Sequence, residues 1–410
     1  MASKPAVSNP ATFSLDPQSE AAACPGGAGN TASDKGVTPT SITFGNVSGL
    51  TGPLPGTDNP GPEAVQALFS AVNAAGGICG RQLKLEVEDD QQDASTNAAD
   101  VSNLISKPVF SFVGSTSDAD NGGVPEMEQA HVPDIGYAIN CNRSLSSEYW
   151  SPAGGSCEQK DGHTYFTDSA FAEAKAAGYL PTRMAFLAYN IGIAADSAKQ
   201  FAAVYQALGG TVCYTDYAIS PASASLTPDV VQIEHDHCNG AFTVLDITGT
   251  GKLLKALQQQ QVHLPFVGTT LEGYAPEQIA DAGESAAQGL TMTLNFIPLD
   301  ENQPAVALYQ QQLATYEPGK QPSAFGFLAW QAGQMLIYAL LEQGHSPTRA
   351  GVVRTFESLR WTGGGALGPY RPAMRSFPPC SVDVFVKGNG FARRAPSSGL
   401  FCGNKAIRVS

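Results

Sequence analysis

The sequence predicts an α/β protein built from two similar, doubly wound lobes, and two observations carry this prediction. First, an alternating strand over residues 42–47 is followed by a helical stripe, a Gly76-Gly77 pair and a second alternating strand over residues 83–87. Second, the same order of strand, loop, helix, Gly-Gly and strand recurs between residues 184 and 214. Because strands joined through a helix pair in parallel with a right-handed crossover, we expect a parallel sheet in each lobe.

The first helix is indicated by apolar residues at helical spacing. Val65, Leu68, Phe69 and Val72 fall at i, i+3, i+4 and i+7, the stripe of a helix that buries one face. The glycine pair that follows favours the left-handed backbone with which helices end. The patterns then predict, in order, a helix over residues 94–106, a strand over 109–113, a short helix over 125–129 and a strand over 132–137.

The second half of the chain repeats this alternation. A stripe over residues 201–208 predicts its first helix, and Gly209-Gly210 ends it. Apolar strands covered on both faces are typical of such a sheet. We expect strands at 184–189, 211–214, 241–245, 265–268 and 290–294, helices at 253–257, 304–316 and 323–343, and a hairpin that turns at 387–390.

Length and charge limit the classes of function. The chain has 410 residues, enough for about two to three domains. Its 23 Lys and Arg residues against 37 Asp and Glu residues give a net charge of −14, which argues against nucleic acid and anionic membranes as partners. No stretch approaches the ~18 apolar residues that a spanning helix needs.

The N-terminal residues predict a leader and not a folded segment. Residues 1–36 are rich in Ala, Ser, Pro and Gly, so we expect a flexible tether, with the fold beginning near Val37. The start at Met1–Pro5 lacks an apolar core, so a secretion signal, if the protein is secreted, is expected to have been removed from this sequence.

Eight cysteines indicate an oxidising compartment. Their number is even and they lack C-x-x-C or zinc-like spacing, which favours disulfides over metal binding. Sequence alone permits ~105 pairings, and free buried thiols are the alternative. Locality favours Cys141 with Cys157, Cys213 with Cys238 and Cys380 with Cys402, which leaves Cys24 for Cys79.

Other chemistries lack their signatures. The segment Gly249-Thr250-Gly251-Lys252 is like the end of a phosphate loop, but Asp246 and Leu253 replace the first glycine and the Ser/Thr of that motif. Neither a dinucleotide-binding G-x-G-x-x-G after the first strand nor a hydrolase G-x-S-x-G is present. The cluster at residues 235–238, His-Asp-His-Cys, lacks a spaced third ligand and is interpreted as a polar loop beside a disulfide. We expect no catalytic residue, no metal and no cofactor.

The ligand-binding loops can be predicted from sheet topology. In open α/β sheets, ligands bind beyond the carboxyl ends of strands, where helix N-termini offer N–H groups and a positive dipole end. In this chain that rule selects residues 48–54, 114–118 and 137–140 in the first lobe and 189–192, 247–250 and 269–274 in the second. Ser115, Thr116 and Ser117 stand out, because hydroxyls and N–H groups at a helix start can hold a carboxylate; simple helix capping is the alternative.

Several of these stretches resemble one protein family. Residues 42–47 with Thr51-Gly52-Pro53, the stretch 73–81 and Glu88-Asp89-Asp90 closely resemble the first lobe of type I periplasmic solute-binding proteins, nearest to the leucine/isoleucine/valine-binding proteins of ABC importers. A looser similarity continues through residues 266–268, 283–290 and 323–326. The resemblance implies two Rossmann-like lobes joined by three crossovers, near residues 165, 296 and 366, with the ligand in the interlobe cleft and a clamshell closure upon it.

The resemblance also implies the extent of each lobe. Lobe 1 would comprise residues 37–164 and 297–365, and lobe 2 residues 165–296 and 366–410, after the leader of residues 1–36.

Roles for individual residues follow from the resemblance. In that family the loop at Ser115–Ser117 holds the α-carboxylate of the ligand. Glu272 falls, within two positions, where the family has an acidic residue for the ammonium group, and Thr270 competes for that place. The full candidate set is Leu54, Ser115, Thr116, Ser117, Tyr137, Asn140, Tyr189, Asn190, Ile247, Thr248, Thr270, Glu272 and Phe325.

Two departures from the family pattern bear on the ligand. The second-lobe loop reads Tyr189-Asn190-Ile191-Gly192-Ile193, where the family commonly has an acidic residue and a Tyr-Gly pair. The usual arginine of the first crossover is replaced within residues 165–168, Tyr-Phe-Thr-Asp. Besides an amino acid, these departures leave open a larger or more apolar carboxylate, such as an aromatic acid.

The function expected from the resemblance is capture of a small organic solute for an ABC permease in the membrane. The protein would be a monomeric binding protein, extracytoplasmic and tethered to the membrane as a lipoprotein, and not an enzyme. Two alternatives remain at this point: a sensor that presents the ligand to a receptor, and, with less support, an enzyme on the same scaffold.

Overall fold

The computed structural model describes Cys24 and residues 29–409, and the chain divides into two compact units. Unit 1 comprises the chain up to Glu158 together with Asn302–Phe377, and unit 2 comprises Gln159–Glu301 together with Pro378–Ser410. Each unit is therefore assembled from two separate segments of the chain.

Unit 1 contains the predicted parallel sheet. Its five strands lie in the order β2-β1-β3-β4-β5, and every neighbouring pair is parallel. β1 pairs with β2 over its whole length, so the alternation in residues 42–47 and 83–87 correctly predicted two adjacent strands. The strands are β1 (Ser41–Ser48), β2 (Gln82–Asp89), β3 (Phe112–Val113), β4 (Asp134–Ile135) and β5 (Tyr149–Trp150).

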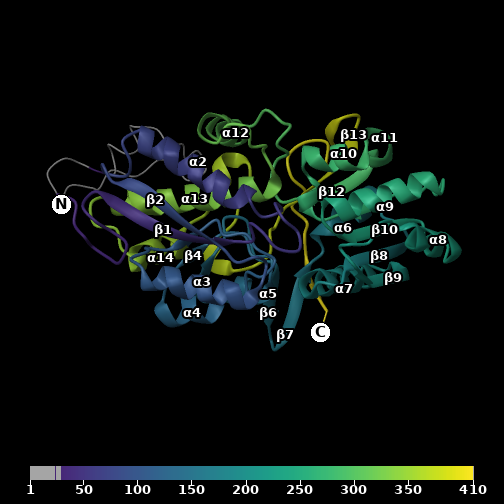
Figure 1. Ribbon diagram of the computed structural model, residues 1–410, viewed down its shortest axis with the longest axis horizontal. Helices are drawn as coiled ribbons and strands as arrows, with labels where there is room; N and C mark the ends of the chain where they lie inside the picture. The colour runs from purple at the N-terminus through teal and green to yellow at the C-terminus, as the bar shows by residue number, and fades with distance from the viewer. Residues whose placement is uncertain (1–23, 25–28, 410) are drawn as a thin grey trace. The chain divides into compact units, whose positions relative to one another are not determined.

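Helices cover both faces of this sheet. In Figure 1, α2 and α13 lie on one side of the strands and α3 and α4 on the other, as the doubly wound prediction requires. Two of the predicted helices, over residues 94–106 and 304–316, have the predicted bounds. The helices of unit 1 are α2 (Pro60–Ala74), α3 (Ala94–Ser106), α4 (Val124–Ala130), α5 (Cys141–Leu145), α12 (Pro304–Tyr316), α13 (Ala324–Gln343) and α14 (Arg349–Ser358), with 3-10 turns η2 (Gly363–Gly365) and η3 (Pro372–Met374).

The long helix α13 is the core helix of unit 1. By length and composition it would be able to cross a membrane, but 94% of its most apolar stretch is buried inside the fold. It packs against α2, and Gly333 lets the two helices approach, since a Cβ there would lie 2.5 Å from a methyl carbon of Leu68. Its hydrophobicity is therefore explained by burial in the protein.

The glycine pair after α2 has the predicted backbone. Gly76 and Gly77 have φ values of 110° and 77°, and Gly77 N donates to Val72 O at 2.8 Å. A Cβ on Gly77 would lie 2.0 Å from Arg81 O, so the turn that carries the chain into β2 requires glycine for space as well as for φ.

The folded part of the chain begins before Val37. Most of the expected flexible leader, residues 1–23 and 25–28, lies outside the described residues. Its described end is bonded to unit 1: Asn30 Nδ2 donates to Cys79 O at 2.8 Å, and the buried Arg81 donates to Thr31 O at 3.0 Å and to His345 O at 2.7 Å. These bonds place the start of the fold at about residue 30.

Unit 2 contains a seven-stranded sheet. The strand order is β14-β13-β12-β11-β10-β8-β9. The last five strands in this order pair in parallel, and β13 and β14 form the expected antiparallel hairpin at the edge. The strands are β8 (Arg183–Tyr189), β9 (Thr211–Ile219), β10 (Gly240–Val244), β11 (Val267–Thr269), β12 (Leu290–Leu294), β13 (Val382–Lys387) and β14 (Gly390–Ala395). A separate sheet has the order β15-β7-β6, from β6 (Cys157–Lys160), β7 (His163–Thr167) and β15 (Ala406–Arg408).

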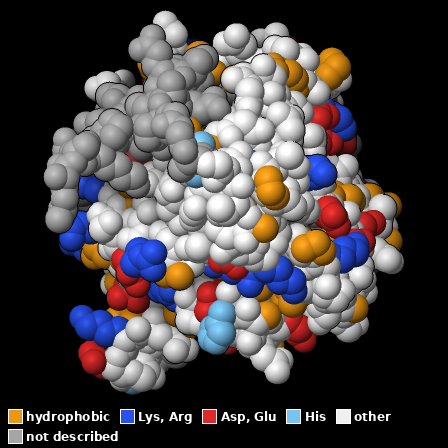
Figure 2. All heavy atoms as spheres, turned by 90° about the vertical axis from the view of Figure 1, so that its left-hand side faces the viewer, with side chains coloured by type: hydrophobic (Ala, Val, Ile, Leu, Met, Phe, Trp, Pro, Cys, Tyr) orange, Lys and Arg blue, Asp and Glu red, His pale blue; other side chains and the backbone are white. Residues whose placement is uncertain are grey.

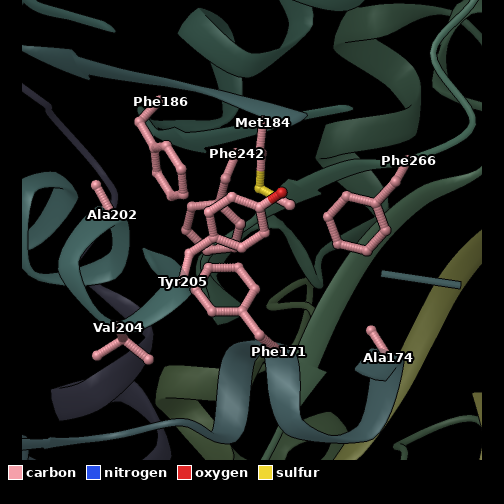
Figure 3. Close-up of a cluster of buried hydrophobic side chains, with 9 residues drawn as sticks. All are labelled: Phe171, Ala174, Met184, Phe186, Ala202, Val204, Tyr205, Phe242 and Phe266. Atoms are coloured by element: carbon pink, nitrogen blue, oxygen red, sulfur yellow. The ribbon is translucent and has the colours of Figure 1, made fainter. Parts of the chain in front are cut away.

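An aromatic cluster joins two helices to the unit 2 sheet. Figure 3 shows Phe171 of α6 and Tyr205 of α7 facing Phe186 of β8 and Phe242 of β10, and Phe171 lies 5.3 Å from Phe242 between ring centroids. Offset and edge-on aromatic pairs of this kind stabilise a core beyond the area they bury. The helices of unit 2 are α6 (Ser169–Ala177), α7 (Gly192–Ala207), α8 (Thr227–His235), α9 (Ile247–Gln259), α10 (Pro276–Ala282) and α11 (Glu284–Ala287), with the 3-10 turn η1 (Leu271–Gly273).

All eight cysteines form disulfides, with the pairing that locality favoured. The structure contains Cys24–Cys79 and Cys141–Cys157 in unit 1 and Cys213–Cys238 and Cys380–Cys402 in unit 2. The free-thiol alternative is therefore wrong.

The visible surface is mixed in character. Figure 2 shows one face of the molecule, on which Lys and Arg side chains lie among Asp and Glu and the hydrophobic side chains are scattered. The exposed large hydrophobic residues Val87, Val231, Tyr316 and Met374 belong to four different elements, β2, α8, α12 and η3. Single apolar side chains of this kind are normal on a soluble surface.

Candidate functional site

Three loops and two helix N-termini meet at one edge of the unit 1 sheet. Because β1, β3 and β4 are parallel, the loops after them lie at the same edge. The start of α2 reaches this edge, since a Cβ on Gly61 would lie 1.9 Å from Thr116 Oγ1. The start of α13 reaches it too, because the ring of Phe325 lies 6.2 Å from that of Tyr137. The structure thus places Thr116 beside the start of α2, and Tyr137 beside Phe325 at the start of α13.

The hydroxyls of the Ser115–Ser117 loop are engaged within unit 1. Ser115 Oγ accepts from Val47 N at 3.1 Å, Thr116 Oγ1 donates to Gly114 O at 3.3 Å, and Ser117 Oγ accepts from Ala119 N at 3.0 Å. The expectation that this loop starts a helix is wrong, because α4 begins at Val124 and turns fill the segment between them. Neither the helix dipole nor helix capping therefore accounts for these residues, and a carboxylate held here would depend on backbone N–H groups.

A buried arginine supports two of the three loops. Arg143 is 1% exposed; it donates to both carboxylate oxygens of Asp134 at 2.7 and 2.9 Å, to Asp120 Oδ2 at 3.1 Å and to Ser115 O at 3.1 Å. The two carboxylates raise the pKa of the Arg143 guanidinium despite its burial. Such a charge-assisted network holds the loop after β3 and the loop after β4 in one arrangement. The sequence patterns gave no signal for Arg143, Asp120 or Asp134.

Asn140 holds the loop after β4, which also carries Tyr137. Asn140 Nδ2 donates to Asp118 O at 2.9 Å and to Asp120 Oδ1 at 2.7 Å, so its amide is part of the framework. Burial, together with the nearby Asp120 carboxylate, raises the pKa of Tyr137 to about 12, so its hydroxyl keeps its proton at neutral pH. Tyr137 is thus positioned as an aromatic surface with a neutral hydroxyl.

The loop after β1 is tied down by Asp89, the last residue of β2, and by Gln92, which follows that strand. Asp89 accepts from the backbone N–H groups of Leu50 and Thr51 at 3.0 and 3.1 Å, and Gln92 makes two bonds to the backbone of Leu54, at 2.8 and 3.0 Å. Backbone and hydroxyl donors lower the pKa of Asp89 against its partial desolvation, which keeps it ionised. Leu54 is buried and contributes apolar surface here.

Two further polar residues at this edge escaped the sequence patterns. Asp58 is fully buried, and burial raises its pKa well above the usual range, with further upward contributions from the nearby Asp118, Asp90 and Asp120 carboxylates. A Cβ on Gly49 would lie 2.6 Å from Asp58 Oδ2 and 3.4 Å from Asp90 Oδ1, so glycine is needed where these carboxyls approach the chain. Asn59 follows as the N-cap of α2, without a capping bond from its side chain.

In unit 2 the loops after β8, β10 and β11 likewise lie at one edge of parallel strands. Tyr189 is 2% exposed and donates from its hydroxyl to Asp246 Oδ1 at 2.6 Å. Asp246 Oδ1 also accepts from Gly249 N at 2.6 Å and so caps α9. Burial and the Asp246 bond raise the pKa of Tyr189, and the Glu272 carboxylate adds to this effect, so Glu272 lies near Tyr189.

The remaining candidates of unit 2 differ in exposure. Ile247 and Thr248 open α9, and Thr248 is exposed while Ile247 is half-buried. Asn190 is exposed, and its N–H donates to Ile219 O at 2.9 Å. Thr270 is the half-buried N-cap of η1, without a capping bond from its side chain. The structure therefore brings Tyr189, Asp246 and Glu272 together, with Thr270 adjoining in sequence.

Three threonines lie buried behind this edge; Thr250 and Thr269 fall within the predicted loops, and Thr243 lies outside them. Thr243 Oγ1 lies 3.0 Å from Thr269 Oγ1 and 3.3 Å from Thr250 Oγ1, so β10, β11 and α9 are linked by hydroxyls. These bonds fix the start of α9 relative to two strands. They act as framework beneath the loops and not as part of their surface.

The cluster at residues 235–238 does not form a metal site. His235 Nδ1 pairs with Asp236 Oδ1 at 2.9 Å, and Cys238 is bonded to Cys213, so its sulfur is not available as a thiolate. Among the residues that the structure describes, no group of three or more His, Cys, Asp and Glu side chains is arranged to hold a metal ion.

Solved structures share this fold. The fatty acid ABC transporter substrate-binding protein from Thermomonospora curvata is similar with a TM-score of 0.72 and 15% identity, over 90% of this chain and 94% of that one. The branched-chain amino acid transporter substrate-binding protein LivJ from Streptococcus pneumoniae, in complex with isoleucine, gives 0.70 and 14% over 90% and 100%. A solute-binding protein of an ABC transporter from R. palustris, in complex with 4-hydroxybenzoate, gives 0.66 and 16% over 90% and 96%.

A family model decides the assignment. No curated protein sequence matches the chain. The model described as periplasmic binding protein, however, matches residues 41–376, which is most of the chain and includes strands of both sheets. The fold likeness and the family match agree with the resemblance in the sequence. The chain belongs to the periplasmic binding protein family.

Proposed function

We propose that this protein is an extracytoplasmic solute-binding protein of an ABC importer that captures a small organic ligand and delivers it to a membrane permease. The observation that carries the proposal is the family match over residues 41–376, which spans the candidate loops of both units. Its four disulfides are in keeping with an oxidising compartment outside the cytoplasm. Tethering to the membrane through the N-terminal segment is part of the same proposal.

The proposed ligand class is a small organic acid with an apolar or aromatic body, an amino acid included. The fold relatives with named cargo are a fatty acid transporter protein and proteins in complex with isoleucine and 4-hydroxybenzoate. In this chain the aromatic pair Tyr137 and Phe325 supplies apolar surface at the unit 1 edge. In unit 2, the edge at the carboxyl ends of the parallel strands has Glu272, with the buried Tyr189 beneath it. Apolar walls with a few fixed polar groups are typical of small-molecule sites.

A thermal-shift screen over amino acids, aromatic acids, fatty acids, sterols and sugars tests the proposal. A ligand at 100 times its Kd stabilises the protein by about 2.7 kcal/mol, which shifts the midpoint by several degrees. We expect at least one carboxylate to act in this way. If only neutral sugars or sterols stabilise the protein, the organic-acid class is wrong.

Variants of the aromatic pair locate the site. Phe325→Ala and Tyr137→Leu should each weaken binding of the stabilising ligand at least tenfold, because both remove ring surface at the same edge. Tyr316→Ala on α12 is a matched control, since Tyr316 is exposed. Binding unchanged in both edge variants would contradict the placement of the site.

The enzyme alternative is separated by recovering the ligand. A binding protein returns the ligand chemically unchanged after prolonged incubation, which mass spectrometry of the released solute measures directly. A chemically altered product would support the enzyme reading.

A further inference from the structure

The chain passes between the two units three times, and in unit 2 the three connections lead into elements that pack together. The junctions lie at residues 158–159, 301–302 and 377–378. On the unit 2 side, the first connection leads through β7 into α6, the second leaves after β12, and the third leads into the hairpin of β13 and β14. α6 packs against β12, β13 and β14. Contacts among these four elements, the root elements, therefore hold all three connections in unit 2.

Two buried carboxyl groups join the root elements. Glu173 of α6 is 2% exposed and Asp383 of β13 is 1% exposed, and Glu173 Oε2 accepts from Asp383 N at 2.8 Å. Thr293 of β12 donates from its hydroxyl to Asp383 Oδ1 at 2.6 Å. Tyr179, which follows α6, donates to Asp383 Oδ2 at 2.5 Å. The pair thus bonds α6, β12 and β13 to one another.

An arginine of β14 ties the second connection to the same cluster. Arg393 Nε donates to Glu301 Oε1 at 2.8 Å, and Glu301 is the last residue of unit 2 before the second junction. The charge of Arg393 also acts on Glu173. All four root elements therefore contribute to the surroundings of the two carboxyls.

The remaining charged and titratable groups that face the pair do not neutralise it. The guanidinium of Arg394 in β14 lies 4.4 Å from the centroid of the Tyr179 ring and acts by its charge on Asp383. Burial and the two carboxyls raise the pKa of Tyr179, so its hydroxyl remains a donor. Among the described residues, no Lys, Arg or His side chain forms an ion pair with either carboxyl.

A proton resolves the electrostatics of this pair. Glu173 Oε1 is buried and has no hydrogen-bond partner in the described part of the chain, so an ionised Glu173 would hold an uncompensated charge beside a second carboxyl. Burial and the neighbouring Asp383 raise the pKa of Glu173 to about 8, and burial raises the pKa of Asp383 to about 6, although their hydrogen bonds and the two arginines act in the opposite direction. At neutral pH the folded pair therefore retains a proton.

We propose that Glu173 and Asp383 form a proton-dependent clamp on the root elements, which weakens solute binding when it releases its proton to solvent. The clamp regulates the proposed solute-binding function and presupposes it. Each disulfide lies within one unit, so any movement of one unit against the other is absorbed in the three connections. Repulsion between two ionised carboxyls loosens the roots of these connections. The fraction of protein in the binding-competent arrangement then falls, and the apparent affinity falls by the same factor.

Solute affinity measured across pH tests the clamp on the unmodified protein. The probes are benzoate, phenylacetate and octanoate, whose charge stays constant between pH 6.5 and pH 9. Calorimetry should show a Kd that rises at least about fivefold over this range for each probe that binds, the lower end of a typical coupling between two sites. A Kd that stays constant from pH 6.5 to pH 9 would overturn the clamp and leave the solute-binding function standing.

Variants then identify the groups responsible. Glu173→Gln keeps the size of the side chain and removes its titration, so the Kd should stay nearly constant with pH. Asp383→Asn removes the neighbouring charge that raises the pKa of Glu173, so the loss of affinity should begin at a lower pH. The exposed Glu234→Gln of α8 is the matched control and should show the pH profile of the unmodified protein. The same profile in Glu173→Gln would refute the role of the pair.

Hydrogen exchange followed by mass spectrometry separates the clamp from the proposed function, because it needs no solute. With exchange times scaled for the intrinsic rate at each pH, peptides from α6, β12 and β13 should lose protection together above about pH 8, while α9 keeps its protection. Glu173→Gln should retain protection in all of them at pH 9.

The combined outcomes distinguish the two proposals. If none of the three probes binds but the root elements lose protection as expected, the clamp stands and the proposed organic-acid binding is wrong. Protection that does not change with pH overturns the clamp. Loss of protection without any change in the Kd of a bound probe overturns its control of binding.

Discussion

Tyr189 and Asp246 connect the end of one strand of unit 2 to the start of a helix. The Tyr189 hydroxyl donates to Asp246 Oδ1 at 2.6 Å, and the same oxygen accepts from Gly249 N in the first turn of α9. The hydroxyl of Tyr189 is therefore committed to the framework, and its ring is buried beneath the edge.

Tyr189→Phe should lower the free energy of unfolding by roughly 1–2 kcal/mol, because one hydrogen bond to a charged group is lost while Gly249 still holds Asp246. It should also weaken solute binding several-fold, since Asp246 and the start of α9 become less fixed. Urea denaturation followed by far-UV circular dichroism, with calorimetry for binding, measures both effects.

Tyr214→Phe is the control for that change. Its hydroxyl donates to Asp229 Oδ1 of α8 at 3.0 Å, so a similar loss of stability is expected without a loss of binding. Equal binding by the two variants would show that the Tyr189 bond does not position the site.

Arg143→Met should destabilise unit 1 by about 3–5 kcal/mol, because it leaves the buried carboxylates of Asp120 and Asp134 without their cation. All three tryptophans, Trp150, Trp330 and Trp361, belong to unit 1, so their fluorescence reports its unfolding. Arg183→Met is the control: Arg183 is exposed and donates only to backbone carbonyls, at 2.8 and 3.1 Å. A loss below 1 kcal/mol in Arg143→Met would contradict the proposed support of the two loops.

Stability of unit 2 should fall as pH rises from about 4.5 to about 8. Glu173 is 2% exposed, and burial together with the neighbouring Asp383 raises its pKa to about 8. The folded protein therefore keeps a proton that the unfolded chain releases near pH 4.5. The free energy of unfolding falls as pH rises between about 4.5 and about 8, because over this range only the unfolded state gives up that proton. Asp383, with its pKa raised to about 6 by burial, adds to the same trend.

Glu173→Gln should remove most of this dependence and make the protein more stable than the unmodified chain at pH 9, by a few kcal/mol at about 1.4 kcal/mol per pKa unit. Glutamine retains the oxygen that accepts from Asp383 N at 2.8 Å. Urea denaturation followed by circular dichroism at pH 5, 7 and 9 tests the change, with the exposed Glu234→Gln of α8 as control. An unchanged pH profile in Glu173→Gln would refute the explanation.

Two disulfides of unit 2 should contribute nearly equally to stability. Cys213–Cys238 and Cys380–Cys402 close loops with sequence separations of 25 and 22 residues, for which chain entropy gives about 3.5 kcal/mol each. Replacing either pair by alanine should cost that amount in urea denaturation at neutral pH. Losses that differ several-fold would show that local packing, and not loop closure, decides their contribution.

The patterns that predicted the fold are those that repeat along the chain. β1, β2 and β12 alternate over five or more residues, and α2 has a full apolar stripe, so each could be predicted from its own sequence. The strand expected at residues 109–113 is assigned only at Phe112–Val113, although Phe110 N donates to Thr43 O at 2.7 Å. β5 and β15 are two and three residues long, too short to show a pattern, and β15 also depends on the distant strand β7 as its partner.

The candidate loops could be predicted because topology alone selects them. The residues that hold those loops could not be, since Arg143, Asp120 and Asp58 are single polar residues in segments without periodicity. Their partners lie up to 34 residues away, as for Asp58 and Gln92. The Ser115–Ser117 loop shows the converse error: hydroxyls that suggest a helix start in the sequence are used in turns and in bonds to β1.

The interleaved composition of the units has a consequence for synthesis of the chain. The core helix α13 and the rest of Asn302–Phe377 complete unit 1, yet they follow every parallel strand of unit 2 in the sequence; β13 and β14 of unit 2 come later still. A growing chain therefore has the unit 1 sheet without α13, and the unit 2 sheet without its edge hairpin, until its last hundred or so residues emerge. Premature termination before α13 leaves both units incomplete, and termination between Phe377 and β14 leaves the unit 2 sheet without its edge strand.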